Sequence, residues 1–146
     1  MNFKSIKLLI ALTLINVTFT SCAQDGAKKN SNNSETEFAQ SSPTVELINP
    51  TDLNAKLGDI QLIDVRTPKE FNNGHIVDAV NINYYDKDFM DQMYKLDKNK
   101  EIYIYCRSGS RSSYAASKLK KQGFTKIYDL QGGILNWNRE KLETVK

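Results

Sequence analysis

Short apolar runs alternate with amphipathic segments from residue 44 to the end of the chain. We predict strands at 45–48, 60–65, 79–82, 102–105 and 126–130, and helical segments at 52–57, 68–72, 88–96, 110–122 and 133–141. Alternating strands and helices with short connections favour an α/β domain, in which a mostly parallel sheet is covered by helices on both faces. This pattern limits the possible folds more than any other feature of the sequence.

A cysteine stands where the most apolar of these runs meets a helix. The run IYIY at 102–105 is apolar at every position, which is typical of a central strand covered on both faces. Cys106 follows it directly, and Ala115, Ala116 and Leu119 then fall on one face of the next helix. Ligands of parallel α/β sheets bind at the carboxyl ends of strands, so we expect the functional site around Cys106.

The segment that follows the strand has the composition of an anion-binding loop. It consists of Cys106, Arg107, Ser108, Gly109, Ser110 and Arg111. Gly109 can adopt a positive φ, and a loop that curls in this way directs successive backbone N–H groups inward. The N-terminus of the following helix adds to the attraction for anions. We therefore predict an anion site made by the backbone N–H groups of residues 107–111.

The same surroundings favour a reactive thiol. Helix N-termini and neighbouring arginines stabilise thiolates, so we predict a largely ionised, nucleophilic Cys106. A thiolate that attacks an anionic substrate meets repulsion of about 4 kcal/mol per pair of charges at about 4 Å. The side chains of Arg107 and Arg111 would offset this repulsion. The alternative is a buried, inert core cysteine, for which two arginines, two serines and a glycine are unsuitable neighbours.

Several further motifs accompany this loop. They are IDVRTPKEF at 63–71, GHI at 74–76, AVNI at 79–82, CRSGSRS at 106–112, LQGGI at 130–134 and Trp137. Together they resemble the rhodanese homology domain over about residues 44–141, with Asp78 and Asn83 as departures from its usual glycine and proline. The resemblance implies a five-stranded parallel sheet with helices on both faces, and a cysteine that carries a persulfide during sulfur transfer. No cofactor is predicted.

Loop length separates two chemistries that resemble each other in fold. The loop from Cys106 to Arg111 has six residues, as in rhodanese-like proteins, whereas dual-specificity phosphatases and arsenate reductases have one more. We therefore predict a sulfurtransferase that moves sulfur from a small anionic donor such as thiosulfate to a thiol, a cyanide-like acceptor or an acceptor protein. The alternatives are a non-catalytic rhodanese-fold binding or scaffold module at the membrane surface and, less favoured, a phosphatase or arsenate reductase.

The N-terminal residues have the features of an export signal. Lys4 and Lys7 precede an apolar run at 8–19, and small residues precede Cys22. This arrangement resembles the lipobox of bacterial lipoproteins, although Phe19 replaces the usual aliphatic residue. We predict a signal peptide at 1–21, a lipidated Cys22 and a tether to a membrane of the bacterial cell envelope, on the periplasmic or surface side. A plain secretory signal and a buried or membrane-spanning helix are the alternatives.

Residues 22–42 contain few apolar side chains and predict a flexible linker, followed by the rhodanese-like domain at 43–146. Removal of residues 1–21 would take away two lysines and no acidic residue, leaving 18 basic and 17 acidic side chains. A net charge of +1 gives no basic field, so we exclude nucleic acid as a partner.

The remaining candidates have structural interpretations. His75 and Cys106 are too few to form a metal site, so none is predicted. We expect His75 to fix a turn by hydrogen bonds and Trp137 to fill the core. Asp64 and Arg66 are expected to join an ion-pair network with Glu70 or its neighbours.

Overall fold

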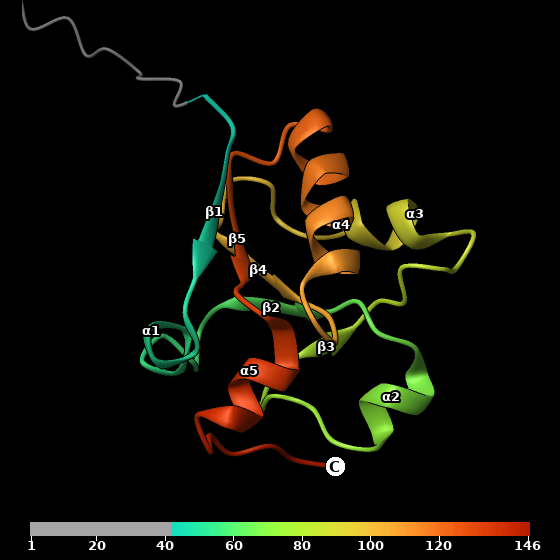
Figure 1. Ribbon diagram of the computed structural model, residues 1–146. Helices are drawn as coiled ribbons and strands as arrows, with labels where there is room; N and C mark the ends of the chain where they lie inside the picture. Colours follow the sequence, from blue (N-terminus) through green and yellow to red (C-terminus); the bar gives the residue numbers. More distant parts are fainter. Residues whose placement is uncertain (1–41) are drawn as a thin grey trace, which may run out of the picture. The chain divides into compact units, whose positions relative to one another are not determined.

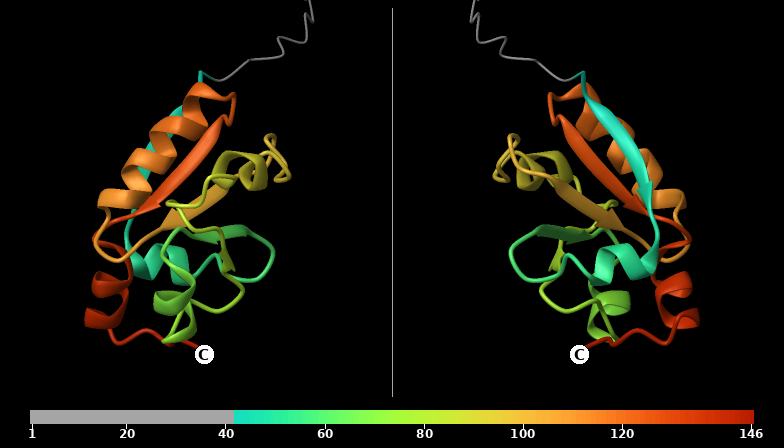
Figure 2. Two further views of the ribbon diagram at one scale, coloured as in Figure 1. Left: turned by 90° about the vertical axis from the view of Figure 1, so that its right-hand side faces the viewer. Right: turned by 90° about the vertical axis from the view of Figure 1, so that its left-hand side faces the viewer.

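The run IYIY forms the middle strand of a five-stranded sheet in the computed structural model, which describes residues 42–146. In spatial order the strands are β1 (Thr44–Ile48), β5 (Lys126–Leu130), β4 (Ile102–Tyr105), β2 (Gln61–Asp64) and β3 (Val80–Asn81), as Figures 1 and 2 show. Every neighbouring pair is parallel. This arrangement confirms the predicted α/β fold with a five-stranded parallel sheet.

Four helices connect consecutive strands, and a fifth follows the last strand. They are α1 (Pro50–Asn54), α2 (Pro68–Asn72), α3 (Phe89–Met93), α4 (Ser110–Lys121) and α5 (Gly133–Arg139). The predicted helix at 52–57 begins earlier in the structure, because the Asn49 side chain accepts a hydrogen bond from the N–H of Asp52 at 2.8 Å and Pro50 opens the helix. The predicted helix at 133–141 is shorter, because Lys141 has a left-handed backbone with φ of 57°.

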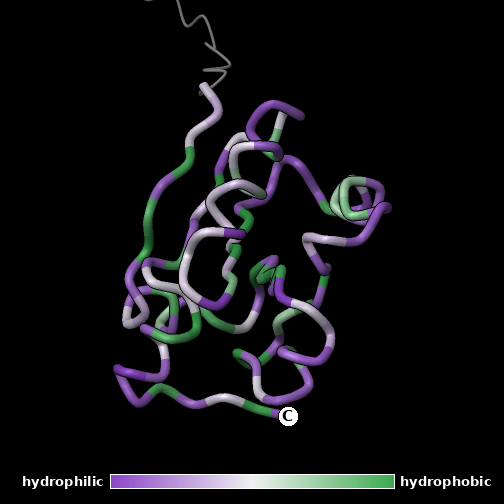
Figure 3. The backbone as a smooth tube through the Cα atoms, turned by 45° about the vertical axis from the view of Figure 1, so that its right-hand side comes forward, coloured by the Kyte–Doolittle hydropathy of each residue, from purple (hydrophilic) through white to green (hydrophobic). Residues whose placement is uncertain are grey.

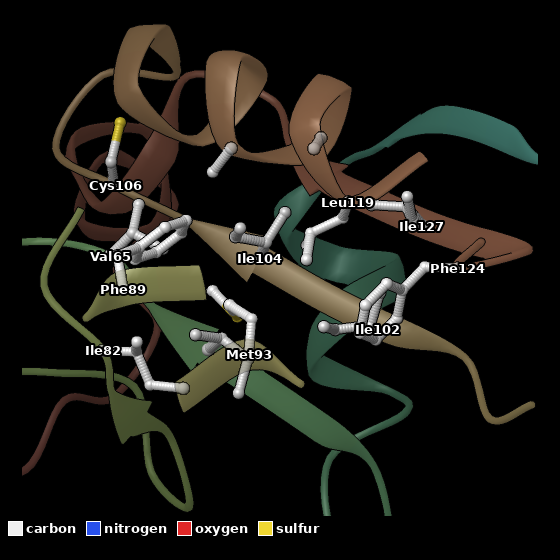
Figure 4. Packing of buried hydrophobic residues seen from close by; sticks show 13 residues of the cluster. Val65, Ile82, Phe89, Met93, Ile102, Ile104, Cys106, Leu119, Phe124 and Ile127 are labelled. Carbon is white, nitrogen blue, oxygen red and sulfur yellow. The ribbon is translucent and has the colours of Figure 1, made fainter. Parts of the chain in front are cut away.

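Two hydrophobic clusters lie on opposite faces of the sheet. Ile102 and Ile104 belong to the cluster that α3 and α4 cover, while Tyr103 and Tyr105 belong to the cluster that includes α1 and α5 residues such as Leu53. The alternation follows from the period of two along a strand. Figure 3 shows how hydrophobic and hydrophilic stretches alternate along the backbone. Cys106 lies at one end of the first cluster, next to the start of α4, as Figure 4 shows.

The residues that follow α5 return to the turn around His75. His75 and Val145 exchange two backbone hydrogen bonds of 2.9 Å, and the indole N–H of Trp137 donates to the carbonyl of Glu143 at 2.9 Å. The His75 ring stacks on Phe71, and its Nδ1 lies 3.2 Å from the Phe71 carbonyl oxygen. Hydrogen bonds therefore fix the turn on both sides of His75.

Two sequence departures from the rhodanese pattern are accommodated locally. Asp78 has a φ of 63°, a left-handed conformation in which glycine is common and which aspartate tolerates better than most residues. The side chain of Asn83 donates to Asp86 at 2.6 Å within the connection that leads to α3.

The predicted signal peptide at 1–21, Cys22 and the linker as far as residue 41 lie outside the described residues. Among residues 42–146, no helix combines the length and the hydropathy that a membrane span requires.

Candidate active site

Cys106 directly follows β4, at the carboxyl end of the central strand. The whole residue is only 1% exposed, whereas Arg107, Ser108 and Ser110 of the loop are exposed. Its side chain points toward the first turn of α4 in Figure 4. A molecule that approaches the thiol therefore meets the polar loop residues first.

Two donors contact the sulfur. The backbone N–H of Gly109 donates to Cys106 Sγ at 3.1 Å, and the hydroxyl of Ser112 lies 3.6 Å from the same atom. Gly109 has a φ of 102°, a left-handed conformation that glycine adopts more readily than other residues. In this conformation its N–H is directed toward the sulfur. Among the N–H groups predicted to face an anion, that of Gly109 is the one that contacts Sγ within the described residues.

Arg111 is held by a carboxylate from a distant helix. Its guanidinium makes two hydrogen bonds to Glu70, from Nη1 to Oε2 at 2.8 Å and from Nη2 to Oε1 at 2.7 Å. Arg111, with smaller contributions from the Thr67 hydrogen bonds, lowers the pKa of Glu70 to about 2, and Glu70 in turn raises the pKa of Arg111. Arg111 thus anchors the loop to α2, and the attraction of a donor by its charge stays a prediction.

The prediction that Asp64 and Arg66 form an ion-pair network with Glu70 is wrong, because Glu70 has a different partner. Asp64 and Arg66 bind each other in the interior, with Arg66 Nε donating to Asp64 Oδ2 at 2.8 Å, and Arg66 also donates to the carbonyl of Gly74 at 2.8 Å. Glu70 pairs with Arg111 instead. The capping box of α2 explains this choice, because Glu70 must face Thr67 and so points toward the loop.

The start of α5 binds the backbone of the loop through hydrogen bonds. The N–H of Ile134 donates to the carbonyl of Cys106 at 2.9 Å, and that of Leu135 donates to the carbonyl of Arg107 at 3.1 Å. A Cβ atom at Gly133 would lie only 2.5 Å from the Cys106 carbonyl oxygen, so glycine alone permits this contact. This contact was not predicted from the sequence, although the paired glycines of LQGGI are a signal for a close backbone contact.

One buried carboxyl group, that of Asp129, was not among the site residues predicted from the sequence. Asp129 is 3% exposed on β5, and burial raises its pKa to about 6, although the Ser112 hydroxyl acts to lower it. The signal was present in the sequence, since one acidic residue stands in the otherwise apolar end of the strand KIYDL.

A polar groove of about 260 Å³ lies beside the loop. Arg66, Glu70 and Arg107 contribute to its walls together with residues at the start of α5. A larger hollow of about 620 Å³ lies at the outer edge of the sheet, next to β1 and α1, and has no residue of the loop in its wall. Of these two hollows, the smaller groove is the one with a loop residue in its wall, the exposed Arg107, which follows Cys106 directly.

No group of three potential metal-binding side chains occurs within residues 42–146. Cys106 is a free thiol in this part of the chain. The described site thus offers a nucleophile, N–H and hydroxyl donors, and arginines.

Comparisons with known proteins identify the same region. A family model described as a rhodanese-like domain matches residues 49–140. A sulfurtransferase of Allochromatium vinosum is 38% identical over 87 residues, which make up 60% of this chain and 79% of the relative. A thiosulfate sulfurtransferase of Shewanella oneidensis is 34% identical over 79 residues, 54% of this chain and 76% of the relative. The crystal structure of a rhodanese-related protein from Thermoplasma volcanium superposes with a TM-score of 0.62 at 30% identity, covering 68% of this chain and 97% of the other.

Proposed function

The chain belongs to the rhodanese-like family, and on this premise we propose that it is an enzyme that carries sulfur as a persulfide on Cys106. The observation that supports this function best is the contact between Gly109 N–H and Sγ at the end of the central strand. A donor directed at Sγ stabilises a negative charge there, which the Cys106 thiolate carries when it attacks the donor and again when the persulfide gives up its outer sulfur.

In the first step, the Cys106 thiolate attacks the outer sulfur of an anionic donor such as thiosulfate. A bond forms between the two sulfur atoms, the S–S bond of the donor breaks, and sulfite leaves with the bonding electron pair. The exposed Arg107 lies on the wall of the groove, where its charge offsets the repulsion between the donor and the thiolate. Sulfite leaves as a stable anion, so no general acid is required.

In the second step, an acceptor thiolate attacks the outer sulfur of the persulfide. The new bond forms to the acceptor, the Cys106 S–S bond breaks, and the Cys106 thiolate is restored. Cyanide takes the sulfur in the same way and becomes thiocyanate. Because the donor product leaves before the acceptor reacts, the kinetics are ping-pong.

The experiment that tests this function is mass spectrometry of the purified full chain before thiosulfate, after thiosulfate and again after cyanide. We expect the peptide that contains Cys106 to gain one sulfur atom and to lose it to cyanide. Cys106→Ser is the matched control, since it keeps the size of the side chain and removes the nucleophile. It should gain nothing while it retains the native circular dichroism spectrum.

A folded native chain with a reduced thiol that gains no sulfur would contradict the proposal for thiosulfate. Repeating the experiment with a thiol persulfide as donor then separates a different donor from the alternative function. Failure with both donors would favour the non-catalytic binding module, for which the burial of Cys106 at 1% exposure is the supporting observation.

We further propose that the chain is held at a membrane of the bacterial cell envelope through lipid on Cys22. This proposal depends on the sequence pattern at 1–22. Several acyl chains on one cysteine hold a protein firmly, since each buried methylene contributes about 0.8 kcal/mol. A flexible linker of about 20 residues would span roughly 25 Å and let the rhodanese-like domain meet donors and acceptors away from the lipid surface.

A further inference from the structure

Asp129 is a buried carboxyl group with one unpartnered oxygen atom among the described residues. Only 3% of the residue is exposed, and its Oδ1 atom has no hydrogen-bond partner among the described residues. A buried carboxylate that lacks a partner destabilises a fold, and a group of this kind calls for an explanation. An apolar residue of similar size would pack on β5 without this cost.

The sheet places Asp129 on the same face as Cys106. Asp129 of β5 is the register partner of Ile104 on β4, and Cys106 follows Ile104 by two residues. Register partners and residues two apart share a face of a sheet, so both side chains lie on the face that α4 covers. Ser112, in the first turn of α4, is 0% exposed and belongs to the same buried layer.

The Ser112 hydroxyl is close to the Cys106 thiol and acts on the pKa of Asp129. It lies 3.6 Å from Cys106 Sγ, and it is the side chain that favours the ionised form of Asp129. The Gly109 carbonyl oxygen, 3.0 Å from the hydroxyl, is an alternative acceptor for its single proton. A serine hydroxyl has one proton and two acceptor lone pairs and rotates freely, so it can take a proton on one side while it gives one on the other.

We propose that Asp129 accepts the proton of the Cys106 thiol through the Ser112 hydroxyl. The S–H bond breaks as its proton moves to the Ser112 oxygen, and the original hydroxyl proton moves to the Asp129 carboxylate. The products are a Cys106 thiolate, an unchanged serine and a neutral Asp129, so protons and charge balance without a further reactant. Asp129 acts through Ser112 and is therefore a positioning residue. The proposal rests on the proposed function, in which Cys106 is the nucleophile.

The surroundings of Asp129 suit this role. Burial raises its pKa to about 6, so the carboxylate is ionised at neutral pH and is a stronger base than an ordinary aspartate. Its register partners are apolar, Ile104 on β4 and Leu47 on β1. Two cations of α4 contact other groups, since Arg111 is bound by Glu70 and Lys118 lies over the Tyr84 and Phe89 rings. Burial and Ser112 are the influences that set the Asp129 pKa in the described part of the chain.

The test is the rate at which iodoacetamide alkylates Cys106 in the full chain between about pH 5 and about pH 8, followed at the peptide that contains Cys106. In the native chain we expect a rise centred near pH 6, where Asp129 loses its proton, and then a plateau. Asp129→Asn and Ser112→Ala should each lose this rise, with a rate at about pH 7 that is lower by about tenfold. Asp91→Asn and Ser113→Ala are matched exposed controls and should keep the native profile.

An Asp129→Asn variant that keeps the native pH profile would overturn the proposal. This holds even if Ser112→Ala loses the rise. If Asp129→Asn fails to fold by circular dichroism, the profile of Ser112→Ala decides, and a native profile there also overturns the proposal. Alkylation requires no sulfur donor. Persulfide formation with unchanged alkylation profiles would therefore reject the proton acceptor alone, whereas a native chain that forms no persulfide would reject the proposed function alone.

Discussion

Arg107 and Arg111 flank the same loop but have different surroundings. Arg111 makes a bidentate pair with Glu70, whereas Arg107 is exposed on the wall of the groove. A paired guanidinium fixes geometry, because the planar fork matches a carboxylate, while an unpaired one remains available to a ligand. The sequence suggests the same role for both residues. The structure instead assigns the anchoring of the loop to Arg111 and leaves Arg107 as the exposed cation.

Asp129 makes the stability of the chain depend on pH with a distinctive sign. Its pKa is about 6 in the fold, against an ordinary value of 3.8. Below the lower value both states are protonated and no destabilisation occurs. Between the two values the unfolded chain ionises while the buried carboxyl stays protonated, so the free energy of unfolding falls by about 2 to 3 kcal/mol and levels off above the folded value. We predict that Asp129→Asn removes this fall and makes the chain more stable at neutral pH, as urea unfolding at about pH 4.5 and pH 7.5 would measure.

The matched control is Asp91→Asn on the exposed side of α3, which should unfold as the native chain does at both pH values. Glu70 contributes in the opposite direction, since its lowered pKa stabilises the fold above about pH 4.5 and the effect is lost as pH falls toward about 2. The difference between Asp129→Asn and the native chain cancels this contribution. Equal stability changes in the two chains would show that folding does not raise the pKa of Asp129.

At the scale of elements, the loop is held between two helices that the strand connections bring together. α2 binds it through Glu70 to Arg111, and the first turn of α5 binds it through N–H groups that donate to the Cys106 and Arg107 carbonyls. Three consecutive segments, β4, the loop and α4, thus depend on contacts from residues far away in the sequence. This support keeps Gly109 N–H directed at Sγ.

We predict that Gly133→Ala slows persulfide formation on Cys106 by at least about tenfold. The new Cβ would lie 2.5 Å from the Cys106 carbonyl oxygen and 2.7 Å from that of Arg107, so the loop must move away from α5. The φ of 59° adds a left-handed strain of about 1 to 2 kcal/mol. The measurements are the rate of sulfur gain by mass spectrometry and the thermal unfolding midpoint.

Gly123→Ala supplies the control for strain alone, because Gly123 has a φ of 89° and a Cβ there would meet no atom within 4 Å. That variant should lose stability and keep the native rate of persulfide formation. A native rate in Gly133→Ala would mean that the loop tolerates displacement, and the close contact with α5 would then have no role in the chemistry.

For the whole molecule, the features that the sequence predicted are those that depend on local pattern. The central position of IYIY follows from a run that is apolar on both faces, and the left-handed Gly109 follows from its place in the loop. The missed features join residues far apart in sequence. Glu70 and Arg111 are 41 positions apart, and the register that brings Asp129 beside Ile104 is set by the sheet. Local spacing contains no information on such pairings, although the lone acid in KIYDL and the paired glycines of LQGGI were visible signals.

The anchor proposal predicts where the whole chain is found in a bacterial host that processes lipoproteins. We expect the native chain in the membrane fraction, resistant to high salt and released by detergent, because acyl chains bind by burial of apolar surface and not by charge. Intact mass spectrometry should show loss of residues 1–21 and the added mass of lipid on Cys22. Cys22→Ser removes the sulfur that would carry the lipid, so this variant should lack the lipid mass and the detergent-dependent release of a processed chain. Cys106→Ser is the matched control and should stay in the membrane fraction. A processed Cys22→Ser chain that partitions like the native protein would show that something other than Cys22 holds the chain at the membrane.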